Sequence, residues 1–138
     1  MVHNEQFQLK TKGFGDTIDI TGKTITITGN SKIKDGLVTV FCPGSTGTIT
    51  TIEYESGVIR DLQKALEKIA PSSTDYEHNI RWGDGNGFSH VRAALMKPSL
   101  TIPLVNGELT PGTWQQIVFI DFDNRGRNRT VVVHIIGE

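Results

Sequence analysis

Apolar residues recur at every second position along much of this 138-residue chain, a period typical of half-buried β-strands. Phe7 and Leu9, for example, alternate with Gln8 and Lys10. Residues 37–42 are instead almost continuously apolar, which favours a central strand covered on both faces. The pattern predicts strands over residues 6–12, 37–42, 46–52, 100–105, 113–122 and 130–136. Residues 17–28 are rich in β-branched side chains and favour strand by propensity, although residues 19–21 could also open a helix.

Two segments follow the period of an amphipathic helix, residues 58–69 and residues 87–96. Their apolar stripes consist of Val58, Leu62, Ala65, Leu66 and Ile69 in the first helix and Phe88, Val91 and Leu95 in the second. We expect Ser56 to cap the first helix and Asn86 to cap the second. A proline follows the end of each segment, Pro71 and Pro98, and stops it.

The order of strands, then two helices, then strands predicts one compact, β-rich α+β domain over residues 1–138, with an antiparallel sheet. Residues 123–126 suit a hairpin turn between the last two strands, and Pro103 favours an edge position for its strand. Residues 117–120 and 131–136 are apolar at both odd and even positions, so both faces of these strands are apolar. Two short helices cannot cover all of that surface, so we expect a second copy of the chain to cover the rest.

Composition narrows the class of protein. The chain has 14 basic and 15 acidic residues, a balance that argues against sequence-independent binding of nucleic acid. Its single cysteine, Cys42, cannot form an intrachain disulfide, and no apolar stretch approaches the ~20 residues that a spanning helix needs. We therefore expect a cytoplasmic protein with no membrane partner.

Candidate chemistry is concentrated in residues 76–90, which carry His78, Asn86 and His90 among three glycines. On the predicted helix Asn86 and His90 share a face that lies away from the stripe of Phe88. His90 could therefore be a ligand-binding residue, which the nearby His78 favours, or a histidine satisfied in the core or at the surface, with Asn86 serving only as a cap. The spacing of the two histidines matches no strong zinc motif.

Three other segments offer weaker signals. Glu53 ends a predicted strand and could be a general base, a metal ligand or a solvated carboxylate. Ser45 and Thr46 lie in a glycine-containing segment that could hold a phosphate but lacks the spacing of a P-loop. Arg125, Arg127 and Arg129 alternate and would project from one side of an extended chain. They could bind phosphate or simply pair with Asp121 and Asp123.

Residues 99–129, SLTIPLVNGELTPGTWQQIVFIDFDNRGRNR, resemble the signature of the YjbQ-like family, whose named activity is secondary thiamine-phosphate synthase. The resemblance extends to residues 36–62 and to the YEHN and DGNGFSHVRAAL segments, and so covers most of the chain. It implies a compact α+β fold that assembles as a homotrimer. The positions that match the family's polar motifs are Glu53, His78, Asn86, His90, Gln115, Arg125 and Arg127.

The resemblance also implies a transferase. It would condense a hydroxymethylpyrimidine pyrophosphate with a thiazole phosphate and release pyrophosphate. Arg125 and Arg127 would contact phosphate with support from Ser45 and Thr46, while His78, His90 and Glu53 would orient ligands, move protons or hold a divalent metal such as Mg²⁺ or Zn²⁺. The alternatives are a metal-dependent hydrolase and a non-catalytic trimer that binds a phosphorylated metabolite.

Two departures from the family pattern affect these expectations. Many members have a histidine in a His-Thr-Thr stretch where this chain reads Gly44-Ser45-Thr46, so a three-histidine metal site would lose one ligand here. Members also commonly have a helix where this chain reads GKTITITGN, residues 22–30. We follow the fold and predict a helix there, because tertiary context can override propensity.

Overall fold

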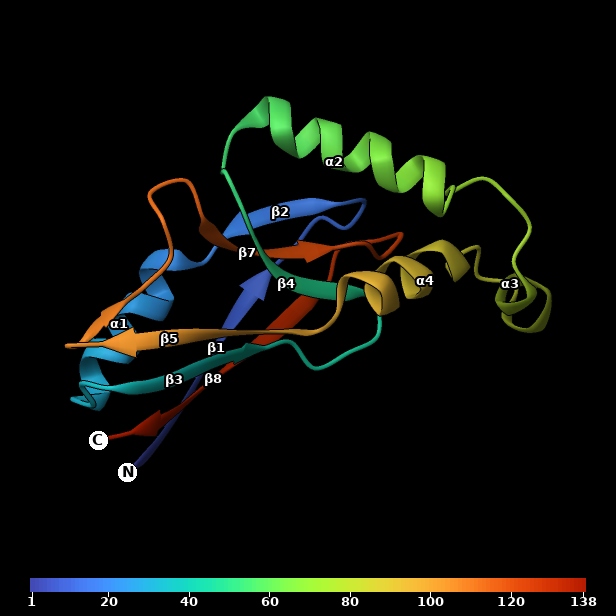
Figure 1. Cartoon of the computed structure of the whole chain (residues 1–138). Helices are drawn as coiled ribbons and strands as arrows, with labels where there is room; N and C mark the ends of the chain where they lie inside the picture. Colours follow the sequence, from blue (N-terminus) through green and yellow to red (C-terminus); the bar gives the residue numbers. More distant parts are fainter.

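The computed structural model describes residues 1–138 and contains two antiparallel sheets and four helices (Figure 1). The five-stranded sheet has the order β1-β8-β3-β5-β6, and the three-stranded sheet has the order β2-β7-β4. In chain order the elements are β1 (Val2–Lys10), β2 (Asp16–Asp19), α1 (Thr21–Ser31), β3 (Gly36–Phe41), β4 (Gly47–Ile52), α2 (Ser56–Ile69), α3 (Glu77–Trp82), α4 (Gly87–Met96), β5 (Ser99–Val105), β6 (Glu108–Leu109), β7 (Gln116–Asp121) and β8 (Asn128–Gly137). The predicted α+β class is therefore confirmed, with four helices where two or three were expected.

The main core lies between the two sheets. Val38, Val133 and Ile135 of the five-stranded sheet pack against Ile49 and Phe119 of the three-stranded sheet, and all five side chains are almost completely buried. Burial of aliphatic and aromatic side chains on this scale is the dominant stabilising contribution to a domain of this size.

The other face of the three-stranded sheet is covered by α2 and α4, so β7 is buried on both faces. Val118, Ile120 and the following Phe122 pack against Leu66 of α2 and Ala93 of α4. The two-sided apolar character of residues 117–120 is thus explained within a single chain and needs no second copy.

The outer face of the five-stranded sheet is uncovered. Leu37 and Phe41 of β3, Val105 of β5 and Ile136 of β8 are all exposed there. The prediction that residues 37–42 form a central strand is confirmed, since β3 lies between β8 and β5. The prediction that both faces of this strand are covered is wrong within a single chain. Val38 and Val40 face the core, and the opposite face of the strand is exposed.

The turn after β7 joins two different sheets, because β7 belongs to the three-stranded sheet and β8 to the five-stranded sheet. The predicted hairpin between them is therefore wrong. The physical reason is that both strands find other partners: β7 pairs with β2 and β4, while β8 pairs with β1 and β3. Pro103 does lie on an exposed edge, because the two-residue β6 pairs only with Leu104 and Val105.

Residues 22–30 are helical, as the family resemblance predicted and local propensity did not. Ile20 and Ile27 anchor the segment in the main core. Two buried threonines of this helix donate their hydroxyl hydrogen bonds to the preceding turn: Thr24 to the carbonyl of Ile20 at 2.9 Å, and Thr28 to that of Thr24 at 2.8 Å. Burial and these bonds together offset the poor helix propensity of β-branched residues.

Helix α2 matches its predicted range, but its cap is Glu55 and not Ser56. The two carboxylate oxygens of Glu55 accept hydrogen bonds from the backbone N–H of Gly57 at 2.6 Å and of Val58 at 2.9 Å. These bonds satisfy N–H groups that have no partner within the helix. None of the four helices has the length and apolar character needed to cross a membrane.

Candidate functional site

The buried face of helix α4 includes three small residues, which let other segments approach the helix closely. Its buried residues are Gly87, Phe88, Ser89, Arg92 and Ala93. The predicted stripe was wrong after Phe88, since Val91 and Leu95 are exposed. A Cβ atom at Gly87 would lie 2.6 Å from the Cβ atom of Tyr76, so only glycine allows this approach. The backbone N–H of Gly87 also donates to the side chain of Asn79 at 2.8 Å, which holds α3 against α4.

This contact brings together the two histidines of the segment. The rings of His78 on α3 and His90 on α4 have centroids 4.5 Å apart and planes tilted by 37°. Burial lowers the pKa of His90 below its usual range, and the nearby charge of His78 lowers it further. The lowered pKa favours the neutral imidazole of His90 at neutral pH. The Nδ1 atom of His78 has no hydrogen-bond partner, and the carboxylate of Asp84 lies 3.4 Å from it.

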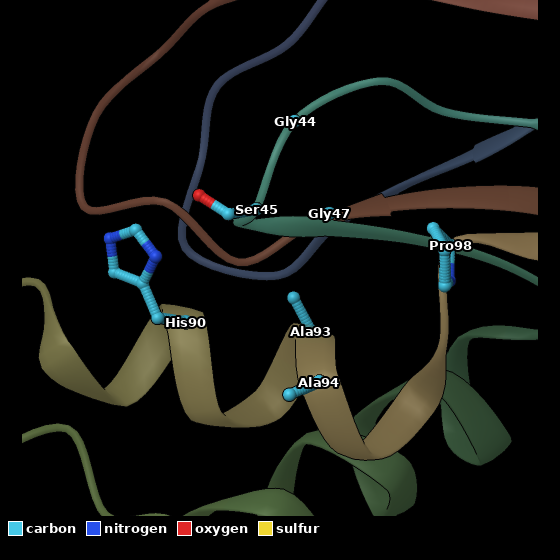
Figure 2. A pocket seen from close by; sticks show the side chains of 7 residues that line it. All are labelled: Gly44, Ser45, Gly47, His90, Ala93, Ala94 and Pro98. Atoms are coloured by element: carbon cyan, nitrogen blue, oxygen red, sulfur yellow. The ribbon is translucent and has the colours of Figure 1, made fainter.

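His90 lines a cavity of about 240 Å³ between α4 and the segment that leads into β4 (Figure 2). Ser45 and His90 lie on facing walls of this cavity, with the small Ala93 and Ala94 leaving its floor open. The backbone N–H groups of Gly44, Ser45 and Thr46 make no hydrogen bond within the protein. Three successive free amides beside a cavity form the kind of backbone site that binds anions. We call this the α4 cavity.

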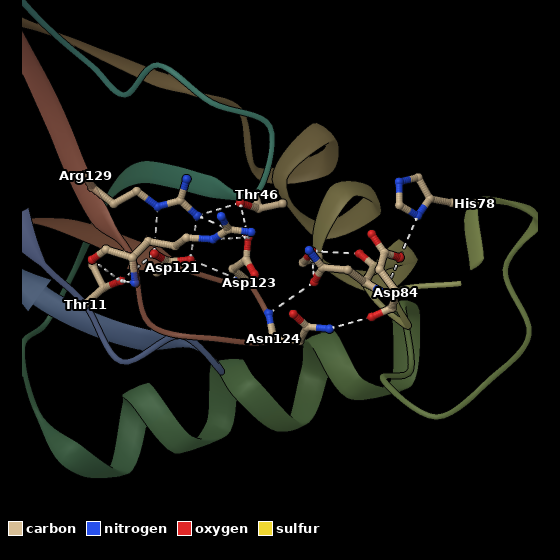
Figure 3. Close-up of polar contacts among 11 residues, drawn as sticks. Thr11, Thr46, His78, Asp84, Asp121, Asp123, Asn124 and Arg129 are labelled. Carbon is tan, nitrogen blue, oxygen red and sulfur yellow. Dashed lines mark hydrogen bonds and ion pairs between the residues drawn. The ribbon is translucent and has the colours of Figure 1, made fainter. Parts of the chain in front are cut away.

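A buried ionic network holds the far side of the segment in place (Figure 3). Arg129 donates to both carboxylate oxygens of Asp121, from Nε at 2.7 Å and from Nη2 at 2.9 Å, and also donates to the Thr46 hydroxyl at 2.5 Å. The Thr46 hydroxyl in turn donates to Asp123 at 3.0 Å. Burial opposes ionisation of Asp123, but hydrogen bonds from Thr46 and Arg127 hold its pKa below the usual range. The network fixes the backbone on which the free amides lie.

The arginines predicted to bind phosphate occupy different environments. Arg127 is ion-paired with Asp123 at 3.2 Å, and Arg129 is committed to the buried network. Arg125 is exposed in the turn and makes no side-chain hydrogen bond or ion pair. Of the residues predicted in the glycine-containing segment, Ser45 faces the α4 cavity, whereas the hydroxyl of Thr46 is used structurally.

Two predicted site residues lie away from the histidines within one chain. Glu53 follows the last residue of β4, whereas the α4 cavity is at Gly47, the first. Gly47 and Glu53 are six residues apart along the strand direction, roughly 20 Å at about 3.3 Å per residue. Gln115 lines a second hollow near that far end together with Thr51, and its side chain accepts a hydrogen bond from the N–H of Gly112 at 2.8 Å.

Asn86 begins α4 as predicted, but its side chain caps no helical N–H group. Its Oδ1 atom instead accepts hydrogen bonds from the hydroxyl of Ser89 at 2.6 Å and from the N–H of Asn124 at 3.1 Å. Asn86 is therefore buried and ties α4 to the turn after β7.

Sequence reasoning assigned no site role to Asp84 and named Asp123 only as an alternative partner of the arginines. Asp84 lies in the histidine-containing segment, so its proximity to His78 was available as a local signal. Asp123 reaches the site only because the chain crosses between the two sheets at this point, a topology that the sequence pattern did not indicate.

A divalent metal fits poorly here. No group of three or more histidine, cysteine, aspartate or glutamate side chains is arranged to hold a metal ion. His78 and His90 supply two nitrogen donors, Glu53 is distant, and Gly44 has no side chain to add a third imidazole. A tetrahedral site of the zinc type needs at least three protein ligands.

The fold and the site together define a small α+β protein with two antiparallel sheets and an open histidine-lined cavity between a helix and the start of a strand. The family model described as "UPF0047 protein YjbQ-like" matches residues 5–138. The chain belongs to this YjbQ-like family.

Relatives with this fold occur in archaea and bacteria. A UPF0047 protein of Methanothermobacter thermautotrophicus is 36% identical over 137 residues, which cover 99% of this chain and 94% of the relative. A YbjQ-like protein of Sulfolobus solfataricus, described as being of unknown function, has a solved structure with a TM-score of 0.95 at 28% identity, covering 100% of this chain and 99% of that one. A Clostridium acetobutylicum member of the YjbQ/UPF0047 family has a TM-score of 0.87 at 38% identity, covering 96% and 99%.

Proposed function

We propose that this chain binds a phosphorylated small molecule in the α4 cavity and catalyses a transfer reaction of the thiamine-phosphate synthase type. One observation carries the proposal: His90, one of a close pair of histidines, and Ser45 line a single cavity beside three successive backbone N–H groups, of residues 44–46, that have no acceptor in the protein. Phosphate oxygens are complementary to such donors. The Ser45 hydroxyl on the same wall adds one more.

In this reaction the ring nitrogen of a thiazole phosphate attacks the methylene carbon of a hydroxymethylpyrimidine pyrophosphate. A C–N bond forms from the nitrogen lone pair, the C–O bond to pyrophosphate breaks, and pyrophosphate leaves with the bonding electrons. The reaction needs no covalent nucleophile. Its main demands are positioning of the two substrates and stabilisation of charge on the leaving group.

Each residue of the α4 cavity has a defined task in this scheme. The amides of residues 44–46, Ser45 and the imidazole N–H of His90 would donate hydrogen bonds to the departing pyrophosphate. His78, beside Asp84, would orient His90 or pass it a proton. Arg125 is the arginine free to add positive charge, whereas Arg127 would first have to leave Asp123. No step is assigned to a metal ion, because the donor set does not fit one.

The decisive experiment compares His90→Ala with the matched control His3→Ala, a histidine paired with Glu5 on β1 and outside the α4 cavity. Pyrophosphate binding is measured by titration calorimetry, thiamine phosphate formation by product assay, and Tm on the same preparations. His90 is only partly buried, so we expect its loss to change Tm by no more than about 2 °C. We expect His90→Ala to abolish pyrophosphate binding and turnover, and His3→Ala to retain both.

A large fall in Tm with pyrophosphate binding intact would show that His90 is a packing residue and would overturn the proposal. Pyrophosphate binding that depends on His90 without any product from the two substrates would instead favour a non-catalytic phosphometabolite-binding protein. The first outcome tests whether His90 belongs to a binding site, and the second tests whether that site catalyses the proposed reaction.

We also propose that the chain assembles as a homotrimer. The uncovered face of the five-stranded sheet, with Leu37, Phe41, Val105 and Ile136 exposed, supports self-association.

A further inference from the structure

A second cavity, of about 370 Å³, lies against the opposite face of α4. Phe88 and Arg92 line it, whereas His90 and Ala94 line the α4 cavity. At about 100° per residue, Phe88 and Arg92 lie on one side of the helix and the other two lie roughly opposite. The two cavities share no lining residue, so this is a separate site.

Arg92 supplies a prepositioned donor in this second cavity. Its Nε atom donates to the carbonyl of Ala70 at 3.0 Å, and its Nη2 atom donates to Glu67 at 2.7 Å. These two bonds fix the guanidinium plane, which also lies over the Phe88 ring at 5.0 Å. The third nitrogen, Nη1, makes no hydrogen bond in the protein and is not among the buried polar atoms that lack a partner. Its two N–H groups are free to bind a ligand.

Phe14 also lines this cavity, in a backbone conformation that is unfavourable for phenylalanine. Its φ angle is 55°, in the left-handed region that phenylalanine rarely adopts, and its side chain is 69% exposed. Its backbone N–H donates to the carbonyl of Asp123 at 2.7 Å, which holds the strained residue in place. A strained backbone that presents an aromatic ring to solvent beside a cavity is a feature found at binding sites.

We infer that this second cavity binds a planar aromatic ring that carries a hydrogen-bond acceptor at its edge. The ring would lie against Phe14 and Phe88, and the acceptor would take the free N–H groups of Arg92. Both oxygens of Glu67 already accept hydrogen bonds, and its charge is compensated by Arg92, so the ligand need not be charged. The Oδ1 atom of Asn124 has no donor in the protein and offers an acceptor to an amide-bearing ligand.

The test uses benzamide, which has the ring, the carbonyl acceptor and an NH₂ donor. It is titrated into ¹⁵N-labelled full-length protein and followed by amide and Arg Nε–H chemical shifts. We expect saturable shifts at Phe14, Gly85, Phe88 and Arg92, with much weaker effects from acetamide, which lacks the ring, and from benzylamine, which lacks the acceptor. Phe14→Ala should bind benzamide about tenfold more weakly. Trp114→Ala, which removes another exposed aromatic ring outside the cavity, should bind it as the unaltered chain does.

Phe14→Gly separates a binding role from a packing role. Glycine tolerates the positive φ angle, so this variant should lose benzamide affinity without any fall in Tm. Absence of saturable shifts at the cavity, equal benzamide affinity in Phe14→Ala, or equal binding of acetamide would each overturn the inference. It would also fail if Phe14→Ala altered the sedimentation mass but left benzamide binding unchanged, since Phe14 would then be a contact between chains.

Discussion

Replacement of Asp121 by asparagine should destabilise the chain strongly while preserving the shape of the side chain. Asp121 is completely buried and accepts four hydrogen bonds, two of them from Arg129, one from the Thr11 hydroxyl and one from the N–H of Asp123. Each charge-assisted bond from Arg129 contributes about 1.5–3 kcal/mol. Asparagine carries no charge and keeps only one acceptor oxygen, so it can retain at most one of these two bonds. The expected loss falls in the 3–5 kcal/mol typical of breaking a buried ion pair at one partner.

The free energy of unfolding lost by Asp121→Asn should lie near 3 kcal/mol, at the lower end of that range. The reason is that Asp123 remains 3.6 Å from Nη2 of Arg129 and retains part of the compensation. Arg129→Met should cost a similar amount, because it leaves the carboxylate of Asp121 buried without its partner. The double variant should lose less than the sum of the two, by more than about 1 kcal/mol, since each single change already breaks the same pair.

Urea unfolding followed by circular dichroism, at one fixed protein concentration, measures these differences. Asp61→Asn is the matched control: Asp61 is exposed on α2 and makes no hydrogen bond or ion pair, so its loss should change stability by less than about 0.5 kcal/mol. If Asp121→Asn cost no more than this control, or if the two single changes were additive, the buried network would not be a stabilising unit.

Three further outcomes follow from other features. Sedimentation equilibrium at micromolar concentration should give three chain masses, and Ile136→Lys on the open sheet face should reduce this to one; a monomer of the unaltered chain would refute the proposed trimer. Gly13→Ala should cost more than about 2 kcal/mol, because φ is 72° and the added Cβ would lie 2.4 Å from the carbonyl oxygen of Arg125, whereas Gly22→Ala in α1, with nothing within 4 Å, should not destabilise. Hydrogen bonds from the backbone of α2 lower the pKa of Glu55, so its contribution is present above the unfolded pKa and is lost as pH falls through the lower folded pKa. The Tm difference between Glu55→Ala and the unaltered chain should therefore be clear at pH 7 and shrink below about pH 4; a constant difference would argue against the cap.

Local patterns predicted the elements well and their partners poorly. The alternation in β1 depends on neighbours within the same segment, so the sequence indicates it. The predicted stripe of α2 was right only in part, because Leu66 is buried but Ile69 is 66% exposed. The prediction of a hairpin at residues 123–126 was wrong. Turn-forming residues indicate that the chain reverses direction, but they do not indicate which sheet the next strand joins. Helix α1 could be predicted only from the family resemblance, because its stability depends on burial of Ile20 and Ile27 in a core built from distant strands.

The residues of the candidate site were likewise predictable from the sequence only in part. His78, His90 and Ser45 were identifiable as polar residues among glycines, and the structure brings all three to the α4 region. Glu53 was chosen from its place after a predicted strand and Gln115 by resemblance alone, and both lie at the other end of β4 in a single chain. The commitment of Arg127 to Asp123 could not be read from spacing, because the same alternation suits both a phosphate site and an internal ion pair.

The place of β8 in the five-stranded sheet determines when the chain can fold. This strand spans Asn128–Gly137, yet it lies between β1 and β3 and is the only partner of β1. Val131, Val133 and Ile135 also complete the main core. During synthesis, β1 and β3 must therefore leave the ribosome with unpaired backbone edges and wait until residues 128–137 emerge. A topology so dependent on distant pairing makes folding slow. Until β8 pairs with them, the open edges of β1 and β3 can associate with other chains.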